Sequence, residues 1–216
     1  MMSGRVATDP SLAERLAVRL KKPLPGRVAQ SQCEPELSFG RHYAPAPDSA
    51  RPAAVLALLY WHHDKWYLPL TVRPATMADH AGQISFPGGA IEAGESSDEA
   101  ALRELEEELG VPREGIQLLG PLTSLYLFVT DFAVSSWVAA IDHRPDFAPC
   151  AREVAKVLEV PLDHLLDRRH RGTHVRHHGK LEFSAPHIDW QQYHIWGATG
   201  MMLSELLAVI EDLAVD

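Results

Sequence analysis

Residues 88–111 read GGAIEAGESSDEAALRELEEELGV, and this stretch decides the fold of the chain. Its second half is typical of a helix. Ser96 is a favourable N-cap residue, and Glu99 three positions later completes a capping box, in which two side chains satisfy free N–H groups of the first turn. Gly110 favours the end of the helix because glycine readily adopts the left-handed conformation found there. We therefore expect a helix between Ser96 and Gly110, preceded by a glycine-containing loop.

The expected helix has an apolar face and an acidic face, since successive residues are rotated by about 100°. The apolar face holds Leu102, Leu105 and Leu109, and the roughly opposite face holds Glu104, Glu107 and Glu108. Three carboxylates within one turn repel one another unless a cation neutralises them. Hard cations such as Mg²⁺ prefer oxygen ligands, and open coordination positions leave room for substrate phosphates. A solvated acidic helix face is the alternative interpretation.

These residues belong to a wider spaced pattern, which also includes the glycine loop. The pattern runs Gly89, five residues, Glu95, seven residues, Arg103-Glu104-Leu105, one residue, Glu107-Glu108, one residue, Gly110-Val111. It resembles the Nudix box, residues 89–111 here, at every defined position. The resemblance implies an α/β (α+β) fold, an α/β/α sandwich with a mixed central sheet. It also implies hydrolysis, dependent on Mg²⁺ or Mn²⁺, of a nucleoside diphosphate linked to another group.

The carboxylates of the box are the expected metal ligands. Glu104 and Glu108 lie at positions i and i+4 and can reach one ion together. Glu107 is expected either to bind a second ion or to act as the base that prepares the attacking water. The resemblance adds the backbone carbonyl of Gly89 to the metal ligands.

Two further residues of the box are expected to support the catalytic carboxylates. We predict that Arg103 orients them by ion pairs rather than contacting the substrate, and a helix-face salt bridge would amount to the same role. Glu95 is predicted to tie the loop to the helix.

Four residues outside the box are further candidates for the site. Arg73 and Gln83 are expected to contact the substrate, with packing or loop hydrogen bonding as the alternative. His80 is expected to contact a phosphate or to act as an acid, the alternative being an exposed loop histidine. Glu153 is considered as a distal base that approaches the metals, against a solvated strand glutamate.

The residues before the box narrow the resemblance to one branch of the family. Residues 70–73 read LTVR and residues 80–89 read HAGQISFPGG, which is similar to coenzyme A (CoA) pyrophosphatases. Residues 160–162 and 195–199 agree with that branch. The chain departs from it at Pro74 and at Ala78, where the branch carries a small residue and an arginine. Ala78, together with Glu95, which keeps the general form of the box where CoA-type boxes often vary, leaves open another nucleoside diphosphate substrate (ADP-ribose, NADH or a dinucleoside polyphosphate). A catalytically silent ligand-binding module is the third alternative.

Composition sets the remaining expectations. A chain of 216 residues with 46% hydrophobic residues can form one domain with a sizeable core, and we assign residues 51–216 to the Nudix domain and residues 1–50 to an N-terminal helix and extension that pack on it. A net charge of −9 argues against nonspecific nucleic-acid binding. Two cysteines, no apolar leader and no membrane-length apolar run predict a cytoplasmic protein with free thiols. The expected partner is a small-molecule diphosphate, with no nucleic acid and no membrane, and the chain is expected to be a monomer or a homodimer.

Hydrophobic periodicity predicts the other elements. Helices are expected over residues 11–22, 162–166 and 197–213, and strands over residues 53–61, 66–73, 116–129, 132–141 and 153–160. Residues 168–180, RRHRGTHVRHHGK, predict a basic, His-rich hairpin or surface loop. No ligand spacing typical of zinc is recognisable within that segment.

Overall fold

The computed structural model describes residues 6–75 and 82–214. Its α-helices are α2 (Leu12–Arg19), α3 (Arg27–Gln30), α4 (Ser97–Leu109), α5 (Leu162–Leu166) and α6 (Gly197–Asp212). Short 3-10 helices are η1 (Ser31–Cys33), η2 (Glu36–Ser38), η3 (Arg41–Tyr43) and η4 (Arg168–His170). The strands are β1 (Arg51–His62), β2 (Lys65–Val72), β3 (Ile84–Ser85), β4 (Gly88–Ala90), β5 (Gln117–Pro121), β6 (Leu125–Leu127), β7 (Phe132–Ile141), β8 (Lys156–Pro161), β9 (Arg171–His178), β10 (Leu181–Trp190) and β11 (Tyr193–Trp196).

The central sheet is mixed, as the resemblance implied. Its main path runs β3-β2-β1-β7-β5, and β4, β6 and β8 pair with β1, β7 and β2 respectively. The long pairing of β1 with β7 is parallel, whereas the neighbouring pairs are antiparallel. β1 is the middle of this sheet, and it pairs at its N-terminal end with the short β4.

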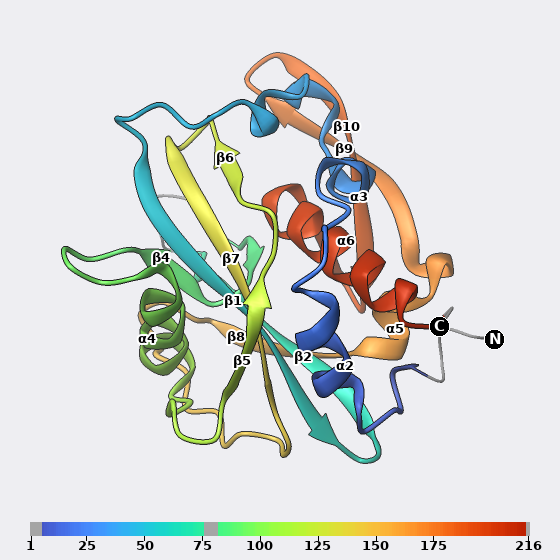
Figure 1. Ribbon diagram of the computed structural model, residues 1–216. Coiled ribbons are helices and arrows are strands. Elements are labelled where there is room, and N and C mark those ends of the chain that lie inside the picture. Colours follow the sequence, from blue (N-terminus) through green and yellow to red (C-terminus); the bar gives the residue numbers. More distant parts are fainter. Residues whose placement is uncertain (1–5, 76–81, 215–216) are drawn as a thin grey trace.

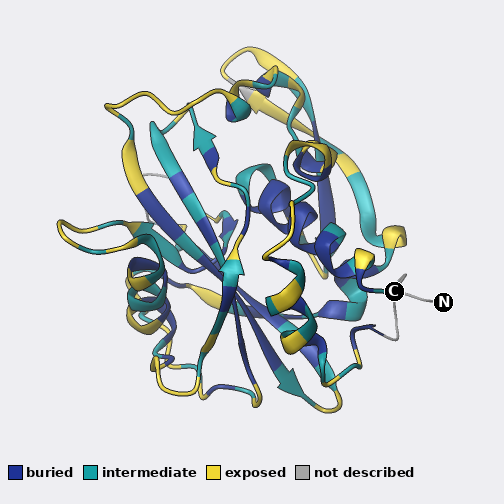
Figure 2. Ribbon diagram, viewed as in Figure 1, coloured by how far each residue is buried: buried dark blue, intermediate teal, exposed yellow. Residues whose placement is uncertain are grey.

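Helices cover both faces of the central sheet, which makes an α/β/α sandwich (Figure 1). Side chains alternate along β1 between two cores. Leu56, Leu58 and Tyr60 pack in the core under α4, whereas Ala57 and Leu59 pack in the core shared with α2 and α6. Figure 2 shows the consequence, a strand buried over most of its length between the helix layers. The predicted fold class is therefore confirmed.

The N-terminal segment shares its core with the sheet. Leu12, Leu16 and Leu20 are buried in the same cluster as Leu59 and the apolar residues of α6. Glu205 of α6, fully buried, ties the layers together further. Its carboxylate accepts hydrogen bonds from the N–H of Gly26, the side chain of Gln30, and both the N–H and hydroxyl of Thr123.

The single strand predicted over residues 116–129 is divided in two. β5 ends at Pro121 and β6 begins at Leu125. Between them Thr123 turns toward α6, where its N–H and its hydroxyl both donate to Glu205, 3.1 and 2.6 Å away. A run of apolar residues cannot show this break, because the acceptor comes from a helix about 80 residues later in the chain.

The basic, His-rich segment forms a hairpin, one of the two structures predicted for it. β9 pairs with β10, and β10 with β11, to make a three-stranded antiparallel sheet outside the central one. The prediction over residues 168–180 did not include the strand β10. Ile188 and Ile195 of this second sheet are fully buried and join the core that contains α6.

Candidate functional site

The sequence determines the helix of the box locally. The capping box between Ser96 and Glu99 is present, and Gly110 adopts the left-handed conformation with φ of 67°. α4 therefore occupies the predicted residues. Its apolar residues Leu105 and Leu109 are fully buried against the sheet, so that the position of the helix is set by packing as well as by its caps.

The two glycines of β4 let the loop and the helix approach each other closely. A Cβ atom on Gly88 would lie 2.4 Å from the carbonyl oxygen of Ala54 in β1, and one on Gly89 would lie 2.3 Å from Oε1 of Glu104. Both distances are far below van der Waals contact, so larger residues would displace β1 or the carboxylate. The carboxylate of Glu104 thus lies directly against the backbone of Gly89.

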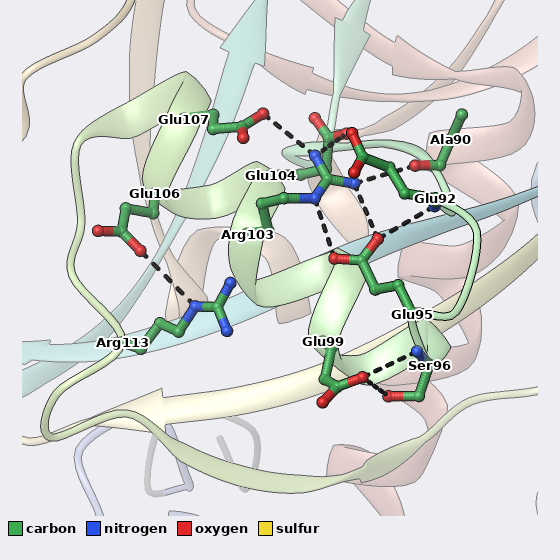
Figure 3. A network of polar contacts seen from close by, with 10 residues as sticks. All are labelled: Ala90, Glu92, Glu95, Ser96, Glu99, Arg103, Glu104, Glu106, Glu107 and Arg113. Atoms are coloured by element: carbon green, nitrogen blue, oxygen red, sulfur yellow. Dashed lines mark hydrogen bonds and ion pairs between the residues drawn. The ribbon is translucent and has the colours of Figure 1, made fainter.

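Arg103 lies at the centre of the carboxylates and uses all five of its N–H donors (Figure 3). Nε and Nη2 bind both oxygens of Glu95 at 2.9 and 3.1 Å. Nη1 donates to Glu104 at 2.8 Å and to Glu107 at 3.1 Å, and Nη2 also reaches the carbonyl of Ala90. The guanidinium joins the loop, Glu95 and two helix carboxylates in one network, and it holds the pKa of Glu95 below its ordinary value.

Glu108 differs from the other box acids because it points into the protein. Its side chain is 4% exposed, and the prediction that it lies opposite the apolar face is wrong. The N–H of Gly88 in β4 donates to it. Its Oε2 has no hydrogen-bond partner in the described part of the chain. Burial, followed by the nearby charge of Glu104, raises the pKa of Glu108 to about 8.

Glu104 and Glu107 differ in exposure. Burial raises the pKa of Glu104, with the charges of Glu107 and Glu153 adding to the rise and the bond from Arg103 opposing it. Glu107 is the outermost acid, with 58% of its side chain exposed against 12% for Glu104. Two inward carboxylates and one outward carboxylate therefore share one end of the site.

This donor set fits a hard divalent cation. An unpartnered buried oxygen on Glu108, raised carboxyl pKa values and converging negative charge are all relieved by a bound positive ion. The ligands would come from Glu104 and Glu108, with Glu107 as the solvent-facing member and the backbone of Gly89 alongside. Oxygen-only ligands of this kind favour Mg²⁺ or Mn²⁺ over softer metals.

Residues outside the box reach the same site to different extents. Arg73 lies close enough to Glu108 for its charge to lower the pKa of that carboxyl, and its Nε has no hydrogen-bond partner among the described residues. The backbone N–H of Arg73 donates to the carbonyl of Gln83, 3.0 Å away. Glu153 lies in a turn, before β8, and not in the predicted strand, yet its charge acts on both Glu104 and Glu108. His80 lies outside the described residues.

Gln83 also lines an apolar pocket of about 500 Å³. Its wall includes aromatic and aliphatic side chains from η2, β6 and the residues after it, β10, the end of β11 and the start of α6, among them Phe128, Phe183 and Trp196. Three of the large hydrophobic side chains that remain exposed lie along it, namely Phe39 (77%), Val129 (73%) and Leu181 (57%). Sequence reasoning missed this pocket because its walls come from segments distant in the chain, and exposed apolar residues were its only local signal.

Comparisons with known proteins agree with the geometry of the site. The family model described as NUDIX domain matches residues 50–180. A Nudix hydrolase called NudL from Pectobacterium atrosepticum is 36% identical over 175 residues, which are 77% of this chain and 89% of that protein. A NudL from Cronobacter sakazakii is also 36% identical, over 72% of this chain and 81% of that protein.

A solved structure agrees in fold alone. The MutT/nudix family protein from Enterococcus faecalis is 18% identical and superposes with a TM-score of 0.51, covering 83% of this chain and 68% of that chain. Within the described residues, no helix is long and apolar enough to cross a membrane. Because the family match spans more than half of the sequence and its relatives align over most of their length, the chain belongs to the Nudix hydrolase family.

Proposed function

We propose that this Nudix hydrolase cleaves the diphosphate of CoA or of an acyl-CoA. The products would be 3′,5′-ADP and 4′-phosphopantetheine, or its acyl form. The observation that carries the metal-dependent chemistry is the buried carboxylate of Glu108, whose Oε2 has no partner among the described residues, beside Glu104 and the glycines of β4. A buried acid of this kind is stable as an anion only when a cation neutralises it.

The side chains of the box divide the work in this proposal. Glu104 and Glu108 hold the cation, and the outward Glu107 meets the water that attacks the diphosphate. Arg103 is a positioning residue, because all its donors are used within the protein and none is left for substrate. Glu95 keeps that guanidinium in place. The bound divalent ion supplies Lewis-acid polarisation of the phosphate and lowers the pKa of water.

Arg73 is proposed to bind a phosphate of the substrate. Its partly unsatisfied guanidinium lies beside the carboxylates, and an arginine can bind two phosphate oxygens at once. Gln83 connects this residue with the apolar pocket, since its carbonyl accepts a hydrogen bond from the backbone N–H of Arg73 and Gln83 also lines the pocket wall. We assign the pocket to the pantetheine or acyl arm, because its wall is mostly hydrocarbon and aromatic ring.

A substrate panel with Mg²⁺ tests the proposal. Purified protein should hydrolyse CoA and a medium-chain acyl-CoA with higher kcat/KM than ADP-ribose, NADH or a dinucleoside polyphosphate. Phe128→Ala, in the pocket, should raise KM for the acyl-CoA more than for ADP-ribose. Turnover of ADP-ribose without turnover of CoA would reject the substrate assignment but keep the hydrolase.

The alternatives are a Nudix hydrolase of another nucleoside diphosphate and a silent ligand-binding module. Ala78 and Glu95, at which the chain differs from the usual CoA branch, favour the first, and the same panel decides between them. A silent module would bind Mg²⁺ and leave every diphosphate intact. The complete set of box acids argues against it, and Glu107→Gln or Glu108→Gln should reduce kcat by orders of magnitude if the chain is an enzyme.

A further inference from the structure

A second cluster of metal-ligating side chains lies on the three-stranded sheet, away from the box. His187 and Asp189 come from β10, and His194 comes from β11. One ligand atom from each lies within 4.8 Å of the others. We propose that these three residues bind a divalent transition-metal ion of the zinc class.

The sheet register brings the three side chains to one face. His187 and Asp189 are two positions apart on one strand, so their side chains point the same way. Asp189 pairs directly with His194 across the β10–β11 ladder. His174 of β9 joins the same face, because it pairs with Ala185, which is two positions from His187.

Both imidazoles converge on one carboxylate oxygen. Nε2 of His187 lies 3.1 Å from Oδ1 of Asp189, and Nδ1 of His194 lies 2.7 Å from the same atom. In a tetrahedral zinc site, bonds of about 2.0–2.1 Å place neighbouring ligand atoms roughly 3.3 Å apart. The two contacts to Asp189 are slightly shorter than this spacing and all three ligand atoms lie within 4.8 Å of one another, so small side-chain shifts would admit an ion. Within the described residues, Asp189 makes no ion pair with an arginine or a lysine, so that its charge is available to a metal.

The surroundings fix the orientation of the buried ligand. Nδ1 of His187 lies 2.9 Å from Nδ1 of His174, and this hydrogen bond turns Nε2 of His187 toward Asp189, where a metal would bind it. Gly172, opposite His187, provides the space, since a Cβ atom there would lie 2.8 Å from Nε2. His187 is 5% exposed, whereas the other two ligands are about half exposed, which gives an ion a route from solvent.

The ligand chemistry distinguishes this site from the box. Two imidazole nitrogens and one carboxylate oxygen suit Zn²⁺, Co²⁺, Ni²⁺ or Cu²⁺, whereas Mg²⁺ prefers oxygen alone. With three protein ligands, one coordination position remains for water. The ion would tie β10 to β11 next to Trp196, whose ring contacts His174 and lines the apolar pocket. The alternative is a hydrogen-bonded His–Asp cluster without a metal.

Metal titration of the purified protein tests the proposal. Co²⁺ should give the visible absorption of a nitrogen-ligated tetrahedral ion at one equivalent, and Zn²⁺ should displace it. Asp189→Asn and His194→Gln change half-exposed side chains and should fold normally. Removing a residue that only hydrogen-bonds to a metal ligand costs about 10–100-fold in metal affinity. Removing a ligand itself should therefore weaken Zn²⁺ binding at least about tenfold.

A matched control comes from another histidine pair. The rings of His62 and His63 lie 3.8 Å apart at the β1–β2 turn. His62→Ala disrupts that pair and leaves the residues of the proposed metal site unchanged. That variant, and Glu108→Gln in the box, should keep the Co²⁺ spectrum. Absence of the spectrum in the unmodified protein, equal affinity in His194→Gln, or loss of the spectrum in His62→Ala would overturn the proposal. None of these results depends on the substrate of the hydrolase.

Discussion

Replacing Glu108 by glutamine should stabilise the metal-free protein at alkaline pH. The pKa of Glu108 is about 8 in the folded protein, against an ordinary value of 4.5. A carboxyl with a higher pKa when folded binds its proton more tightly in that state, so unfolding releases the proton. The contribution of this group to stability is therefore fully present below pH 4.5 and is lost as the pH rises through 8. Glutamine occupies the same volume and has no charge to bury.

The size of the effect follows from the two pKa values of Glu108. A tenfold difference in proton affinity between the folded and unfolded states corresponds to about 1.36 kcal/mol, and integration between pH 6 and pH 9 gives a loss of about 2–3 kcal/mol for this group. For a chain of 216 residues, that loss lowers Tm by about 5–10 °C. The side chain is 4% exposed, so solvent screens the effect little.

Thermal and urea unfolding in EDTA, at pH 6 and at pH 9, measures this difference. Subtracting the curves of the unmodified protein from those of Glu108→Gln removes the contributions of other titrating groups. Mg²⁺ should restore stability at pH 9 in the unmodified protein and have little effect on the variant. Parallel pH profiles for the two proteins would refute the reasoning, as would equal stabilisation of both by Mg²⁺.

Three further changes test other contacts. Gly89→Ala places a Cβ atom 2.3 Å from Oε1 of Glu104, so kcat should fall about 10–100-fold with little change in Tm, and unchanged kinetics would exclude the close approach. Arg103→Lys keeps the charge but cannot make five fixed bonds, so Mg²⁺ affinity and kcat should each fall at least about tenfold, and a titration with near-normal affinity would contradict the positioning role. Glu205→Gln places an amide NH₂ among the donors from residues 26, 30 and 123. The free energy of unfolding, measured in urea, should fall by at least about 2 kcal/mol, whereas kcat should not change.

The parts of the site that the sequence could predict are local. The capping box, Gly110 and the i, i+4 spacing of Glu104 and Glu108 depend on neighbours within a few turns. Arg103 and Glu95 are eight residues apart, and their bidentate contact follows from a short loop that folds back on the helix. Such features need no knowledge of the remaining chain.

The parts that could not be predicted depend on tertiary packing. Helical periodicity places Glu108 near the polar face, but tertiary packing buries it, with the N–H of Gly88 in β4 donating to its carboxylate. Glu153 comes close to the acids because the segment before it binds the end of the helix, where the N–H of Cys150 donates to the carbonyl of Glu108. The distance between these segments in the chain conceals both contacts.

The two proposed cation sites differ in how the chain assembles them and in what they bind. The box collects its oxygen ligands within one helix and its loop, although tertiary packing buries Glu108. The cluster of His187, Asp189 and His194 exists only when β10 and β11 are in register, so an ion there stabilises that pairing. Because oxygen and imidazole ligands select different cations, Mg²⁺ and Zn²⁺ should stabilise the protein independently. Additive shifts in Tm are the consequence, with His194→Gln removing only the Zn²⁺ shift and Glu108→Gln only the Mg²⁺ shift.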